Sequence, residues 1–126
     1  MPAYSFQEQF CEPVETGRKT HTIRGKRKHR PKPGQTFYGY YAMRTKACRK
    51  LIQSIITRVQ DITIVQSKTG VYCISIDGEA LFPDEKEALA VRDGFANFEA
   101  MTKFWPPRRL PFFGDIIHWN YEKRVK

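Results

Sequence analysis

The chain has 126 residues, of which 40% are hydrophobic and 13% aromatic, so its composition is that of one folded globular domain and excludes a disordered segment. Its 22 Lys and Arg residues exceed its 13 Asp and Glu residues, and the formal net charge of +9 favours a polyanionic partner. No apolar run approaches the roughly 18 residues of a membrane-spanning helix, so no role in a membrane is expected.

The side chains that most often bind metals or form disulfides are scattered along the chain: Cys11, Cys48, Cys73, His21, His29 and His118. No CxxC or HxxxH spacing occurs among them, and an odd number of cysteines leaves one without a disulfide partner. We therefore expect a reduced, cytoplasmic protein with neither a metal site nor a cofactor.

The first elements in chain order are a helix and several strands. Residues 10–17, FCEPVETG, are predicted to form a short helix that ends at Gly17. After a turn at KPGQ, residues 36–43 form an aromatic-rich strand, and residues 51–65 carry two β-branched stretches. Residues 71–81 alternate between apolar and polar side chains up to an Asp-Gly turn. These segments are expected to be consecutive antiparallel strands.

The second half begins with two helical patterns. Residues 84–93 form one helix, and residues 97–105 form another, with Asn97 as its N-cap and two prolines after its end. Residues 106–113, PPRRLPFF, are expected to form a loop, and residues 114–122 a final strand. This order predicts a single α+β domain over residues 1–126, with flanking helices around a curled, mostly antiparallel sheet or small β-barrel.

One segment, GRKTHTIR at residues 17–24, combines residues that can carry chemistry. A Thr hydroxyl such as that of Thr22 attacks only if a base removes its proton, and Lys19 serves as that base only if burial or neighbouring cations lower its pKa. In a regular strand the two side chains would point to opposite faces, so they meet only if the chain bends just after Gly17 or continues as a helical turn. The alternative is an ordinary strand with a solvated lysine.

A run of positive charge follows this segment and gives the candidate nucleic-acid-binding residues: Arg18, Arg24, Lys26, Arg27, Lys28, Arg30 and Lys32. Arg24 would contact a phosphate or a base edge, and the residues after it would bind backbone phosphates. The alternative is a solvated surface loop. Three tyrosines, Tyr38, Tyr40 and Tyr41, are either stacking platforms for bases or core residues.

The same segments resemble a known family. GRKTHTIR, followed by KPGQTF, by AVRDGF before a helix that ends in FW, and by a final GDIIHW, is similar to the ASCH domain from about Phe6 to Trp119. The resemblance implies a PUA-like β-barrel with its G-x-K-x-x-T-x-R signature beside a cleft. A small bacterial branch of that family hydrolyses N4-acetylcytidine with a Lys, a Thr and a Glu, which correspond here to Lys19, Thr22 and, as a shorter acid, Asp93.

Three functions stay open at this point, of which the third is a protein-interaction domain without a nucleic-acid partner. The first is a binding module that holds RNA or a nucleotide in the signature cleft, with the basic run extending the contact. The second is a hydrolase acting on an acylated nucleoside or on RNA, in which Thr22 attacks, Lys19 activates it, and Asp93 orients Lys19 or shuttles a proton. The charge of +9 favours the first, and the intact Lys19 and Thr22 favour the second.

Overall fold

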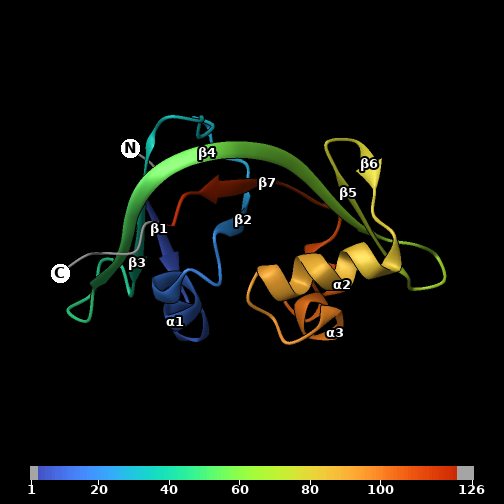
Figure 1. Ribbon diagram of the computed structural model, residues 1–126. Helices are drawn as coiled ribbons and strands as arrows, with labels where there is room; N and C mark the ends of the chain where they lie inside the picture. The colour runs from blue at the N-terminus through green and yellow to red at the C-terminus, as the bar shows by residue number, and fades with distance from the viewer. Residues whose placement is uncertain (1–2, 122–126) are drawn as a thin grey trace.

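The longest element, strand β4 (Arg49–Gln66), arches over the molecule, and the helices lie on the concave side of the arch (Figure 1). The computed structural model describes residues 3–121. The other strands are β1 (Ala3–Phe6), β2 (His21–Gly25), β3 (Thr36–Tyr41), β5 (Tyr72–Ile76), β6 (Glu79–Ala80) and β7 (Phe112–Trp119). The helices are α1 (Glu8–Thr16), α2 (Pro83–Arg92), α3 (Phe98–Thr102) and a 3-10 helix at Pro107–Arg109.

The seven strands form a mostly antiparallel sheet in which β4 pairs with three neighbours. Its first part pairs with β3, and its second part pairs with β7 on one edge and β5 on the other. β1 lies parallel to β3, and β2 pairs with β7. The register shifts between Ile56 and Arg58 and between Gly39 and Tyr40, and such irregularities bend a strand and increase its twist.

The mixed α and β composition agrees with the expectation from sequence, whereas the sheet is not closed into a barrel. Among residues 3–121, β1 pairs only with β3, and β2 pairs only with β7. No backbone pairing therefore joins β1 to β2. Within the same residues no helix is both long and apolar enough to cross a membrane.

Several predicted boundaries differ from the observed ones. The two β-branched stretches at 51–65 belong to one continuous strand, because the bend between them does not interrupt the pairing. The expected loop at 106–113 contains a 3-10 turn, and β7 begins inside it at Phe112. The predicted end of the last strand at Glu122 lies outside the described residues.

The core lies between the arch and the helices and is rich in aromatic rings. Phe37 is fully buried and stacks on Trp119 with ring centroids 4.4 Å apart and on Tyr4 at 5.4 Å. Helix α1 packs against this core through Phe10 and Val14, which are buried. This core fixes β1, β3 and β7 relative to α1, the helix that precedes the signature segment.

Candidate functional site

A pocket of about 390 Å³ lies where the sheet is open between β1 and β2. Its lining comes from β1, α1, β2, the end of α2, the segment after α3 and the start of β7: Ser5, Phe6, Gln7, Phe10, Lys19, Thr22, Ile23, Arg24, Gly25, Asp93, Phe95, Phe104, Trp105, Arg109 and Phe112. The volume lies within the roughly 300–1,000 Å³ of small-molecule sites, and the lining combines six aromatic residues with seven polar or charged ones. Lys19, Thr22, Arg24 and Asp93 thus share one pocket.

The chain bends just after Gly17, which was the first of the two conditions for bringing Lys19 and Thr22 together. Gly17 ends α1 in the left-handed conformation with φ of +83°. The backbone N–H of Lys19 then donates to the carbonyl of Pro13 at 2.9 Å, and β2 starts only at His21. Lys19 therefore precedes the strand, and its side chain turns into the pocket independently of the strand's alternation.

Asp93 reaches the pocket because α2 ends there. Asp93 is the C-cap residue of α2, and Gly94 follows with φ of +101°, a conformation that favours glycine. A Cβ at Gly94 would lie 2.9 Å from the ring of Phe10 and 3.6 Å from Cδ of Lys19. The Asp-Gly pair thus allows the end of α2 to approach α1 and Lys19 closely.

Lys19 and Asp93 form a buried ion pair. Lys19 Nζ donates to Asp93 Oδ1 at 2.5 Å and to the carbonyl oxygen of Asp93 at 2.6 Å, and the two side chains are 3% and 6% exposed. The carbonyl groups at the end of α2 also favour a cation. Burial lowers the pKa of Lys19 below its ordinary value, although Asp93 opposes this by stabilising the charged form. The shorter acid therefore contacts the lysine directly.

Thr22 and Arg24 lie on β2 and share its pocket-facing side. Arg24 Nε donates to Thr22 Oγ1 at 3.0 Å, and its Nη2 donates to the carbonyl of Ser5 in β1 at 2.9 Å. The Arg24 side chain thereby spans the gap that backbone pairing leaves between β1 and β2. Within residues 3–121 no hydrogen bond joins Lys19 to Thr22. The Thr22 hydroxyl accepts from a guanidinium, and its own proton is available to a base.

His21 is a neighbour of the site that sequence reasoning missed. Its Nε2 lies 3.2 Å from Asp93 Oδ1 but is not aligned for a hydrogen bond, and this buried nitrogen has no hydrogen-bond partner in the described part of the chain. Its ring lies 5.5 Å from that of His118, the residue opposite in the β2–β7 pairing. Burial, together with the proximity of His21, lowers the pKa of His118 to about 4. The only sequence signal was the position of His21 inside the signature segment.

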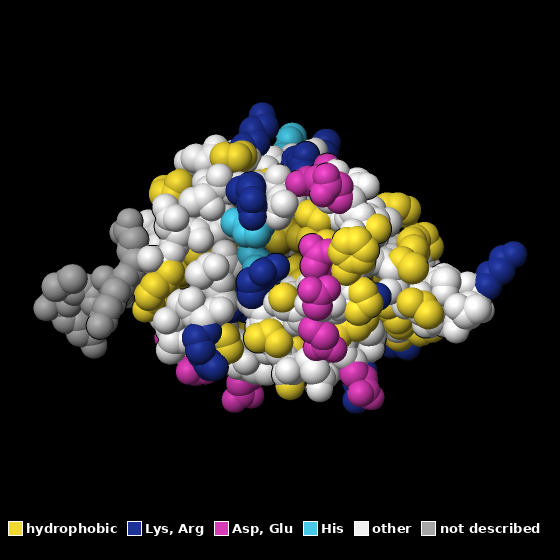
Figure 2. All heavy atoms as spheres, turned by 45° about the vertical axis from the view of Figure 1, so that its right-hand side comes forward, with side chains coloured by type: hydrophobic (Ala, Val, Ile, Leu, Met, Phe, Trp, Pro, Cys, Tyr) yellow, Lys and Arg dark blue, Asp and Glu magenta, His cyan; other side chains and the backbone are white. Residues whose placement is uncertain are grey.

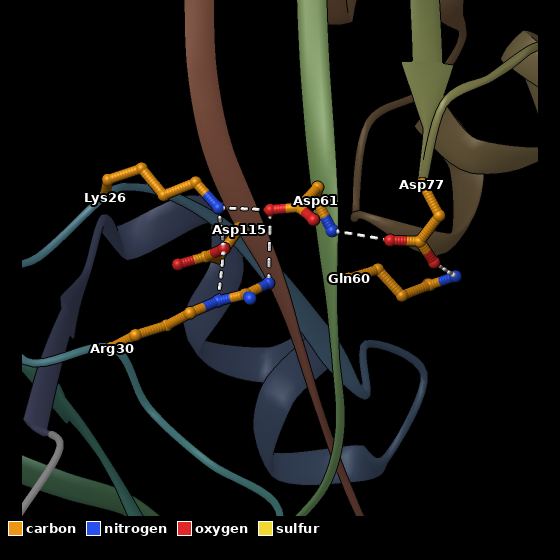
Figure 3. Close-up of polar contacts among 6 residues, drawn as sticks. All are labelled: Lys26, Arg30, Gln60, Asp61, Asp77 and Asp115. Atoms are coloured by element: carbon orange, nitrogen blue, oxygen red, sulfur yellow. Dashed lines mark hydrogen bonds and ion pairs between the residues drawn. The ribbon is translucent and has the colours of Figure 1, made fainter.

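The basic run is partly neutralised within the molecule, which the sequence did not indicate. Lys26 Nζ donates to Asp61 Oδ1 and, at 2.6 Å, to Asp115 Oδ1. Arg30 donates to Asp115 Oδ1 at 3.1 Å and to Asp61 Oδ1 at 3.2 Å (Figure 3). Asp115 is 1% exposed, so these cations compensate a buried carboxylate on β7. Lys26 and Arg30 are therefore paired within the molecule, and their side chains remain 42% and 45% exposed.

Of the remaining basic residues, some contact other parts of the protein and some do not. Arg27 donates to the carbonyl of Ala3 at 2.8 Å and packs over the ring of Tyr4, and Arg18 pairs with Glu12. Lys28 and Lys32 are exposed, and their side chains contact no partner within residues 3–121. On the face in Figure 2, Lys, Arg and His side chains stand opposite a row of Asp and Glu side chains. That face is electrostatically mixed.

The pocket's aromatic lining was also missed from the sequence. The three tyrosines singled out there are absent from the lining, and the buried residues of β3 are Phe37 and Gly39. The rings that line the pocket instead come from five separate segments, so no local pattern groups them. Comparison of the chain with protein-family models, with curated proteins and with solved structures found no match.

Proposed function

We propose that this chain is an ASCH-like hydrolase that cleaves the acyl group from an acylated nucleoside of the N4-acetylcytidine type. The observation that carries the proposal is the buried Lys19–Asp93 ion pair on the wall of an aromatic pocket that Thr22 also lines. Perturbed titratable groups in a cleft are typical of catalytic sites. The finer fold assignment, a PUA-like barrel, is part of the same proposal and is supported by the Arg24 side chain, which links β1 to β2.

In the proposed reaction, Thr22 Oγ1 attacks the acyl carbonyl carbon and loses its proton to Lys19. Arg24, which already donates to Thr22 Oγ1, makes the hydroxyl proton easier to remove, and the negative charge passes to the acyl carbonyl oxygen as the new bond forms. Lys19 accepts a proton only when neutral. It becomes neutral by passing a proton to the carboxylate of Asp93, which its Nζ contacts at 2.5 Å.

Lys19 then returns a proton to the departing amino group of the nucleoside, leaving an acyl ester on Thr22. Water hydrolyses that ester and regenerates the Thr22 hydroxyl, so the net reaction consumes one water and yields the nucleoside and the free acid. The aromatic rings of the pocket would stack on the base.

The test is release of acetate from N4-acetylcytidine. Thr22→Ala should abolish it, and Lys19→Met should do nearly the same, because members of one catalytic unit are not additive. Thr20→Ala is the matched control, since Thr20 lies two residues away but does not line the pocket, and it should retain activity. Absence of acetate release by the wild type at high enzyme concentration would refute the hydrolase, as would full activity of Thr22→Ala.

A second candidate, a module that binds RNA or a nucleotide without turnover, is favoured by Lys28 and Lys32, which follow β2 in the chain, are exposed and have side chains without a partner within residues 3–121. If both contact phosphate, Lys28→Ala/Lys32→Ala should flatten the salt dependence of single-stranded RNA binding by about 1.4 in log–log slope. Lys46→Ala/Lys68→Ala removes the same charge from other exposed positions and should leave the slope unchanged. Equal slopes in both variants would refute a role for the basic run.

A further inference from the structure

The charges that line the pocket do not balance. Three cationic side chains, Lys19, Arg24 and Arg109, face it together with one carboxylate, Asp93. Asp93 already forms an ion pair with Lys19, with 2.5 Å between Asp93 Oδ1 and Lys19 Nζ. Within residues 3–121 no carboxylate forms an ion pair with Arg24 or Arg109. The pocket therefore carries two guanidinium groups without a counter-charge.

Both guanidinium groups are held in place by backbone carbonyls and aromatic rings. Arg24 donates to the Ser5 carbonyl and lies over the ring of Phe6 at 4.8 Å. Arg109 Nη1 donates to the carbonyl of Phe104, and its guanidinium lies 5.7 Å from the ring centre of Trp105. Anchored in this way, the groups lose little conformational freedom when a ligand binds.

The environment of Arg24 makes the missing counter-charge costly. The residue is half-buried, and burial lowers the pKa of its guanidinium. A partly desolvated cation without an anion is unfavourable unless a ligand supplies the charge. A phosphate group would do so, because guanidinium groups form bidentate, charge-assisted hydrogen bonds with it.

We propose that the substrate of this pocket is an anion, an acylated mononucleotide whose phosphate is bound by Arg109, while Arg24 stays hydrogen-bonded to Thr22 and attracts the phosphate only through its charge. Arg109 is the residue that selects for the phosphate, because it takes no part in activating Thr22. The inference deepens the proposed hydrolase by naming its substrate class and rests on the same pocket. The pocket's volume of about 390 Å³ favours a single nucleotide over a longer strand.

The test measures binding, so that it does not depend on turnover. Calorimetry at fixed ionic strength should show that cytidine 5′-monophosphate binds at least about tenfold more tightly than cytidine, the gain expected of one charge-assisted contact. Arg109→Gln should remove most of this preference, and Arg109→Lys should keep part of it. Arg108→Gln is the matched control, since Arg108 is an exposed neighbour that does not line the pocket, and it should keep the full preference.

Equal affinities for cytidine and its monophosphate would overturn the inference, as would equal losses in Arg108→Gln and Arg109→Gln. A short RNA without a terminal phosphate that competes as well as the mononucleotide would overturn the assignment to mononucleotides. Phosphate selectivity without acetate release would refute the hydrolase alone. Acetate release without selectivity would refute this inference alone.

Discussion

Replacing Asp93 with Asn removes one charge of the buried pair and keeps the size of the side chain. Lys19, whose side chain is 3% exposed, would then be a buried ammonium without a carboxylate. The free-energy cost of burying this ammonium has an upper limit, because Lys19 can lose its proton instead. Deprotonating a lysine with an ordinary pKa of about 10.4 at pH 7 costs about 1.36 kcal/mol for each unit of difference, or about 4.6 kcal/mol in all. Broken buried ion pairs cost about 3–5 kcal/mol. We expect Asp93→Asn to lower the free energy of unfolding by that amount at pH 7.

The same reasoning gives the pH dependence. In the variant, folded Lys19 holds its proton less well than unfolded Lys19, so stability rises with pH. At pH 9 deprotonating Lys19 costs only about 2 kcal/mol. The difference in the free energy of unfolding between Asp93→Asn and the wild type should therefore be smaller at pH 9 than at pH 7.

Urea unfolding at pH 7 and pH 9 measures both quantities. Asp61→Asn is the matched control, because Asp61 also pairs with cations but has a side chain that is 58% exposed, and it should cost at most about 1 kcal/mol. If Asp93→Asn costs no more than Asp61→Asn and shows no pH dependence, Lys19 reaches solvent and the argument for a buried pair fails.

Three further predictions concern stability and titration. Gly94→Ala should lower the Tm more than Gly34→Ala, because both residues have positive φ but only the Cβ at 94 would meet the ring of Phe10, at 2.9 Å. The NMR titration of His118 should have its midpoint at about 4 instead of 6.5. Because the unfolded chain takes up this proton at higher pH, stability should be lost as the pH falls through that interval, and His118→Gln should reduce the loss. Ile117→Val, at a position 1% exposed, should cost about 0.5–1.5 kcal/mol in urea unfolding.

The sequence predicted those parts of the site that depend on local chain chemistry. Gly17 as a helix-ending residue was readable, and it is the bend after Gly17 that brings Lys19 and Thr22 to one pocket. The likeness of RDGF to a family motif pointed to Asp93, which contacts Lys19. Their chemical roles are predictions that the acetate assay will test.

The features that local sequence could not reveal depend on contacts between distant segments. Lys26 and Arg30 looked like a free basic run because their partners, Asp61 and Asp115, lie 31 to 89 residues away in the chain. An Asp between apolar strand residues, as in GDIIHW, was the available signal for a buried carboxylate that needs cations. The open sheet was equally hidden, because strand closure depends on long-range pairing that local propensity does not encode.

Strand β4 has a consequence for how the molecule opens. Its residues 49–55 pair with β3, and the residues from Ile56 onward pair with β7 and β5. Both halves of the sheet are therefore built on one unbroken strand, and unfolding of that strand would release both halves. In hydrogen-exchange experiments, β3 and β7 should consequently share one cooperative unit of unfolding. The walls of the pocket, which β1 and β2 supply through these two strands, would then be lost together and not one at a time.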